Sequence, residues 1–131
     1  MLGSPLRRSR ALALGLLLAG GCASAGGPPS ERSSPDVLLA SEMTDWGADD
    51  LLSVILRLRP RWINAPLAVS IMGPVPRPVV VDDVRQRGSV EALRSVRAAN
   101  VAEVRFENAR DATTRYGANM MSGAIVVRTK R

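Results

Sequence analysis

The first 35 residues of this 131-residue chain have a composition that does not suit a packed core, which restricts the fold to the remainder. A basic start with three arginines leads into an apolar run, and small residues follow up to Cys22. This is the three-part pattern of an export signal, so residues 1–21 are interpreted as a signal peptide. The apolar run is too short to span a bilayer, which takes about 20 residues.

The segment after the signal is rich in glycine, serine and proline and has few apolar side chains. Such a segment buries too little apolar surface to offset its ordering entropy, so residues 22–35 are predicted to be a flexible tether. Residues 36–131 then form a single domain, which is long enough for a modest core.

The charge pattern argues against nucleic-acid binding. The formal net charge is +6, and it falls to +3 when the three arginines of the signal are removed. The remaining arginines alternate with acidic residues, as in Glu103, Arg105 and Glu107, which is typical of a solvated surface. Only four aromatic residues occur, and they are scattered, so no base-stacking surface is expected.

The residue types that most enzymes use are missing. The chain has no histidine, which excludes most general acid–base and triad arrangements, and its single cysteine forms no disulfide within the chain. The adjacent pairs Asp49-Asp50 and Asp82-Asp83 diverge on a helix or strand, so spacing alone does not make them a catalytic dyad. We therefore expect a protein that is not an enzyme and has no metal or cofactor.

The letters LLLAGGC, which end at Cys22, resemble the lipobox of bacterial lipoproteins. This resemblance implies that the Cys22 thiol carries lipid, that the signal is cut before it, and that palmitate-type acylation completes the anchor, although Ala19 replaces the usual leucine. Two or more acyl chains anchor a protein stably. Ala23 implies passage to the outer membrane, with the domain in the periplasm. The alternative is an ordinary signal cut near Ala23 or Ala25, which gives a secreted soluble domain.

Hydrophobic spacing predicts an α+β fold, a small mixed sheet with short helices. A helix is expected over residues 45–58, and Pro60 ends it. The other expected elements are strands over 67–72, 79–81, 101–107 and 123–129 and short helices over 89–97 and 109–116. In the third strand, alternation places Ala102, Val104 and Phe106 on one face and Glu103, Arg105 and Glu107 on the other. Ile125 and Val127 are expected to be buried beside it.

Turn chemistry joins these elements. Residues 73–78 contain three prolines, which predicts a connector, because proline removes a backbone donor. Asp82 and Asp83 indicate a turn after a valine strand. Gly117 is predicted to cap the helix before it in a left-handed conformation, and Gly123 to permit a close approach where the last strand begins.

Three segments carry a further resemblance. The first is VVVDDV at 79–84, the second is LRSV at 93–96 followed by VAEVRF at 101–106, and the third is ATTRYG at 112–117 followed after five residues by GAIVVRTK at 123–130. In order and spacing they resemble the plug domain of TonB-dependent outer-membrane receptors. Asp83 replaces the usual glycine of the turn, and Val126 replaces a frequent asparagine.

The resemblance covers residues 66–131 and implies a plug-like module that works by contact with another protein. The chain stops at Arg131, where a receptor's barrel begins, so we expect no transport by this chain itself. The expected function is protein binding or scaffolding, with an envelope protein as the partner. Arg77, Met120 and Met121 lie in predicted loops and are candidate contact residues, although the methionine pair could equally lie in the core. A small-ligand binder that uses a groove between helix and sheet is the alternative.

Overall fold

The computed structural model describes residues 34–131, in which a five-stranded sheet has the order β1-β6-β7-β4-β5. Its strands are β1 (Val37–Leu39), β4 (Val79–Val81), β5 (Val84–Arg85), β6 (Val101–Glu107) and β7 (Ala124–Thr129). β4 and β7 are parallel and the other neighbours are antiparallel, so the sheet is mixed. A separate hairpin pairs β2 (Val69–Ser70) with β3 (Gly73–Pro74). The predicted α+β fold is confirmed.

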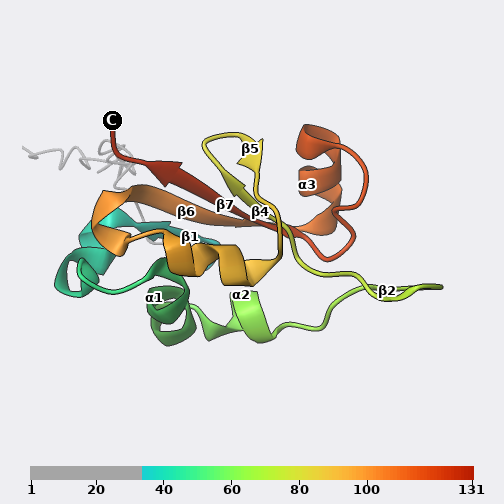
Figure 1. Ribbon diagram of the computed structural model, residues 1–131, viewed down its shortest axis with the longest axis horizontal. Helices are drawn as coiled ribbons and strands as arrows, with labels where there is room; N and C mark the ends of the chain where they lie inside the picture. The colour runs from blue at the N-terminus through green and yellow to red at the C-terminus, as the bar shows by residue number, and fades with distance from the viewer. Residues whose placement is uncertain (1–33) are drawn as a thin grey trace, which may run out of the picture. The chain divides into compact units, whose positions relative to one another are not determined.

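Helices cover both faces of the sheet (Figure 1). The helices are α1 (Leu51–Leu58), α2 (Pro60–Asn64) and α3 (Ala109–Tyr116), with 3-10 helices η1 (Ala40–Trp46), η2 (Val90–Ser95) and η3 (Ala98–Asn100). Side chains of α1, α2 and η2 pack on one face in the main core, whereas α3 packs on the other face against Ala124 of β7. No helix in the described part of the chain is long and apolar enough to cross a membrane.

The helix predicted over 45–58 starts later than expected and ends at Leu58, as predicted. α1 begins only after Asp50, whose carboxylate accepts hydrogen bonds from the backbone N–H (3.0 Å) and hydroxyl (2.7 Å) of Ser53. This cap defines the first turn, and residues 40–46 form the separate helix η1. The residue before Pro60, Arg59, is non-helical, as expected, whereas a second helix, α2, was not expected; it begins at Pro60, a position at which the missing N–H is harmless.

Several short elements also differ from the prediction. β1 was not predicted, because three residues give no usable period. The strand predicted over 67–72 is a hairpin arm that pairs only at residues 69 and 70. The short helix expected over 89–97 is the 3-10 helix η2, which spans only residues 90–95.

β6 and β7 are neighbours in the sheet, as predicted, whereas the exposure along β6 differs from the prediction. Val104 pairs with Val127, and both Ile125 and Val127 are fully buried, as predicted. A β-bulge near the start of β6 breaks the expected alternation, so Val101 is as buried as Val104. Glu107, expected on the solvent face, is only 5% exposed, because the sheet's second face is partly covered there.

Candidate functional site

The most exposed large apolar side chains of residues 34–131 lie on one hairpin, residues 66–76, which we call the finger. Val69 is 74% exposed, Ile71 103% and Met72 91%. The finger contains β2 and β3 and extends away from the five-stranded sheet (Figure 1). The whole run 62–76 carries no charged residue, so the finger presents an apolar surface without ionic groups. An exposed apolar cluster of this kind is typical of a contact site.

The tip of the finger is a tight turn with Ile71 and Met72 at its centre. The Ser70 hydroxyl accepts a hydrogen bond from the Met72 backbone N–H (3.2 Å) and donates one to the Gly73 carbonyl (3.0 Å). Gly73 has φ +108°, a conformation that glycine adopts without strain. These bonds fix the direction in which the two exposed side chains point.

Ser122 ties the two arms of the finger together at its base. Its hydroxyl accepts a hydrogen bond from the Ala68 N–H (2.9 Å) and donates one to the Val75 carbonyl. The N–H of Val75 also donates directly to the Ala68 carbonyl (2.8 Å). The loop before β7 is therefore hydrogen-bonded to both arms of the finger through Ser122, which is itself nearly buried.

Arg77 lies beneath the same base and is only 3% exposed. Its guanidinium donates hydrogen bonds to the carbonyls of Ser122 (2.8 Å), Trp62, Ile63 (3.4 Å), Ala65 (3.4 Å) and Pro66 (3.5 Å). It also lies 5.4 Å from the centre of the Phe106 ring, where cation–π attraction applies. Burial lowers the pKa of Arg77 from its ordinary value. A buried cation thus fixes the chain from the end of α2 into the finger.

The structure corrects the expected exposure of Arg77, and it places the two methionines, for which surface and core were both open, in different environments. Arg77 and Met120 are both buried, so neither side chain is available on the surface. Met120 packs with Ala112 and Ala124 in the small core beneath α3. Met121 is 56% exposed, next to Ser122 at the base of the finger. The tip residues Ile71 and Met72 were missed, although the long uncharged run could have revealed them.

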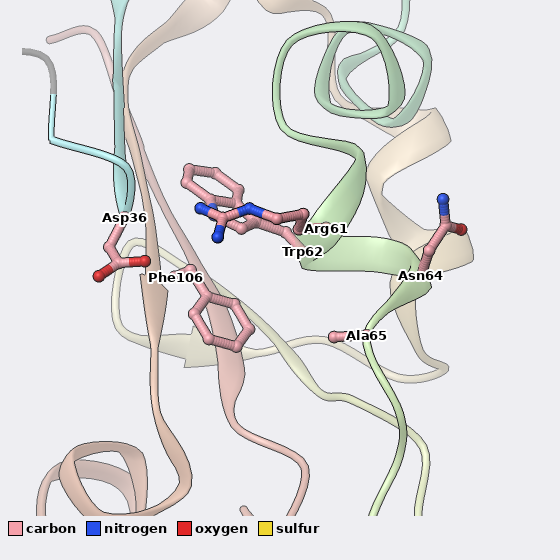
Figure 2. A pocket seen from close by; sticks show the side chains of 6 residues that line it. All are labelled: Asp36, Arg61, Trp62, Asn64, Ala65 and Phe106. Carbon is pink, nitrogen blue, oxygen red and sulfur yellow. The ribbon is translucent and has the colours of Figure 1, made fainter.

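An apolar groove of about 440 Å³ lies beside the start of the finger. Figure 2 shows Asp36 and Phe106 on one side and α2 on the other, with the Ala65 methyl pointing into the space between. The full lining is Asp36, Arg61, Trp62, Asn64, Ala65 and Phe106. The Trp62 and Phe106 rings stack with centres 6.3 Å apart, and the Trp62 indole N–H donates to the Pro35 carbonyl (3.1 Å).

The predicted turn residues all lie at turns. Asp82 and Asp83 have φ +47° and +67° between β4 and β5, and Gly117 and Gly123 have φ +85° and +74°. Gly117 follows α3 as its cap, although its ψ of −164° differs from the left-handed helical value that was expected. A Cβ on Gly123 would lie 2.6 Å from the Glu107 carbonyl oxygen, so the close approach predicted there is present.

Asp82 also joins the turn to the last strand. Its carboxylate accepts hydrogen bonds from the backbone N–H (2.9 Å) and hydroxyl (2.6 Å) of Thr129. These hydrogen bonds lower the pKa of Asp82 below its ordinary value. A carboxyl group with a lowered pKa in the folded state stabilises the fold above its unfolded pKa, and the contribution is lost as the pH falls through the folded pKa.

Changing Asp82 to asparagine should therefore lower stability at neutral pH and matter less in acid. We expect the urea midpoint of Asp82→Asn to lie below that of the unchanged protein at pH 7. The two midpoints should converge as the pH falls below about 4, the ordinary pKa of aspartate. Asp83→Asn, at the same turn, is the matched control. A gap that stays constant from pH 7 to pH 3 would contradict the role of the ionised Asp82 carboxylate.

Four ion pairs occur among residues 34–131, and two of them lie on the second face of the sheet. Arg105 pairs with Glu103 (2.8 Å), and Arg115 pairs with the buried Glu107. Across residues 34–131, no group of three or more potential metal ligands comes together. The described residues therefore offer an exposed apolar contact surface on the finger and ion pairs on the second face of the sheet. Cys22, the predicted lipid acceptor, and the predicted signal and tether up to residue 33 lie outside the described residues.

Comparisons with known proteins find similarity among solved structures. No protein-family model and no curated protein matches the sequence. The chain is similar to the crystal structure of the siderophore receptor PirA from Pseudomonas aeruginosa, with 22% sequence identity and a TM-score of 0.46. The similarity covers 76% of this chain and 19% of the receptor chain, so this chain spans only a small part of the receptor's length.

Proposed function

We propose that this protein is a non-catalytic lipoprotein of the cell envelope, anchored to the outer membrane through Cys22, whose periplasmic domain binds another envelope protein through the finger. The observation that carries the proposal is the uncharged apolar tip at Ile71 and Met72, which a buried arginine and a buried serine support from below. Buried polar groups are costly unless they are fully hydrogen-bonded. The hydrogen bonds of Arg77 and Ser122 at the base of the finger favour a fixed shape for this hairpin. A hairpin of fixed shape that exposes apolar side chains is suited to contact with a protein.

The resemblance to the receptor plug domain supports the same proposal. The three segments that carry it include β4, β6 and β7, which are neighbours in the sheet, with β7 between the other two. They therefore form one structural unit in this chain. A plug works by contact with another protein, and we propose the same mode of action for this domain.

A photoreactive residue at position 72 in intact cells tests the contact surface. The control is the same residue at position 84, because Val84 is also apolar and 63% exposed, on the β4–β5 hairpin. We expect a discrete protein adduct from position 72 alone, and we expect Ile71→Asp to abolish it. In a second arm, Cys22→Ala removes the proposed lipid acceptor and should weaken the adduct. If position 72 yields no protein adduct above the position 84 control, the finger is not a protein contact.

The groove supports a second candidate function, the binding of a small apolar ligand. Its volume lies in the range of about 300–1,000 Å³ that is usual for ligand sites. The Trp62 and Phe106 rings would supply an apolar wall, with Asp36 and Arg61 as polar groups at the edge. A thermal-shift screen against metabolites separates this candidate from protein binding. Ala65→Phe should abolish the rise in melting temperature that a bound ligand causes, and Ile71→Asp should not.

A further inference from the structure

We propose that Met72 is a modification site, at which peroxide oxidises the thioether to a sulfoxide and the sulfoxide weakens the protein contact of the finger. This role rests on the proposed function, because it adds a chemical control to the contact that the finger makes. The positions of the methionines in residues 34–131 support it. Two are buried in the cores and two are exposed, and the exposed ones lie at the tip and at the base of the finger.

The buried methionines provide an internal reference for reactivity. Met43 is 2% exposed in the main core, and Met120 is fully buried in the small core beneath α3. An oxidant reaches their sulfur atoms only when the surrounding structure opens. Met72 is 91% exposed and Met121 is 56% exposed. Because oxidation follows exposure, peroxide should react with Met72 first, with Met121 next, and only slowly with the two core methionines.

The reaction at Met72 requires only the thioether and the oxidant. The sulfur gives an electron pair to one oxygen of hydrogen peroxide, an S–O bond forms as the O–O bond breaks, and water leaves. Sulfur loses two electrons and peroxide gains them, so the step balances without a further reactant. Methionine sulfoxide reductases reverse this modification. Oxidation at Met72 therefore has the chemistry of a switch.

The sulfoxide would change the finger where its surface is most apolar. Met72 lies next to the fully exposed Ile71, and the run 62–76 carries no charged residue. Oxidation converts the apolar thioether into a polar group that accepts hydrogen bonds. Because burying an unpaired polar group is costly, a partner that binds the apolar tip should bind the oxidised finger about tenfold more weakly.

The fold itself does not depend on the Met72 side chain. The turn at the tip is held by the Ser70 hydroxyl, which bonds the Met72 backbone N–H (3.2 Å) and the Gly73 carbonyl (3.0 Å). Oxidation at sulfur leaves both of these bonds in place. The Met72 side chain also lies outside both hydrophobic cores. Oxidation should therefore alter the contact and leave the stability of the domain unchanged.

Peptide mapping by mass spectrometry tests the modification site. The purified full-length chain is treated with hydrogen peroxide, once folded and once unfolded in urea. We expect similar oxidation rates for Met72 in the two states, and a rate for Met120 that is at least about tenfold lower in the folded state. The urea midpoint of the chain oxidised at Met72 should equal that of the untreated chain. Equal protection of Met72 and Met120 in the folded state would overturn the modification site and leave the proposed function standing.

Crosslinking in intact cells tests the switch. A photoreactive residue at position 71 reports the contact, and the measured quantity is the adduct yield after peroxide treatment divided by the yield before it. Any effect of a substitution on the contact itself cancels in this ratio. We expect the yield to fall about tenfold in the chain that keeps Met72, and to be unaffected by peroxide in Met72→Leu, which is apolar and lacks sulfur. Met121→Leu is the matched control, because it retains Met72 and should lose the adduct as well.

The outcomes separate the switch from the contact. A yield that persists once Met72 is oxidised, or that falls equally in Met72→Leu, would overturn the switch and leave the protein contact standing. If position 71 gives no protein adduct before treatment, the proposed function fails, and the switch fails with it.

Discussion

Changing Arg77 to methionine should lower the free energy of unfolding by about 2–6 kcal/mol, because at least two buried carbonyl groups lose their charged hydrogen-bond donor. Methionine keeps the unbranched stem and removes every donor. The carbonyls of Trp62 and Ser122 would then remain buried without the guanidinium, at about 1–3 kcal/mol for each unsatisfied group. Since small domains are stable by only about 5–15 kcal/mol, this loss is a large part of the total.

Urea unfolding and hydrogen exchange measure the two consequences of Arg77→Met separately. The urea midpoint should fall, and the backbone amides of Ala68 and Val75 should exchange faster, because both are bonded at the base of the finger. Arg85→Met is the control, since Arg85 is exposed and such changes usually stay within about 0.5 kcal/mol. Equal midpoints for the two variants would show that Arg77 does not hold the finger.

The strands of the sheet could be predicted because their patterns are local. Three adjacent valines before an aspartate pair mark β4 and its turn, and the alternating run at 101–107 marks β6. Glycine at 117 and 123 could be assigned to turns because few other residues adopt positive φ without strain. Each of these patterns lies within a few consecutive residues, so it can be recognised in a single sequence.

The support of the finger could not be predicted because it depends on contacts far apart in the chain. Arg77 appeared to be a surface residue, since it lies between prolines in a connector and arginine is rarely buried. Its partners come from α2 and from Ser122, 45 residues away. The sequence pattern contains no signal for such a set of carbonyl contacts.

The finger itself was predicted as a connector and a strand, for a different reason. Residues 67–72 are apolar, which normally indicates burial in a sheet. In the structure β2 pairs only with β3, and neither joins the main sheet. Pro74 and Pro76 lack the N–H groups that a central strand donates, so this short hairpin stays outside and its apolar side chains remain exposed.

Changing Gly123 to alanine should cost about 2–5 kcal/mol, because it combines a backbone penalty with a steric one. At φ +74° an alanine pays roughly 1–2 kcal/mol for the left-handed conformation. The added Cβ would also lie 2.6 Å from the Glu107 carbonyl oxygen, in backbone that pairs with β7 and cannot easily shift. Forcing extra volume into packed structure costs about 1–3 kcal/mol more.

Gly88→Ala is the matched control for Gly123→Ala, because Gly88 has φ +90° and open space where its Cβ would lie. Both variants place an alanine at positive φ and carry the same backbone penalty, so the difference between their urea midpoints isolates the clash with Glu107. We also expect Gly123→Ala, and not Gly88→Ala, to loosen the finger, since Gly123 follows Ser122, whose hydroxyl bonds both arms. Faster exchange of the Ala68 amide in Gly123→Ala alone would demonstrate that link, whereas equal midpoints and equal exchange would refute it.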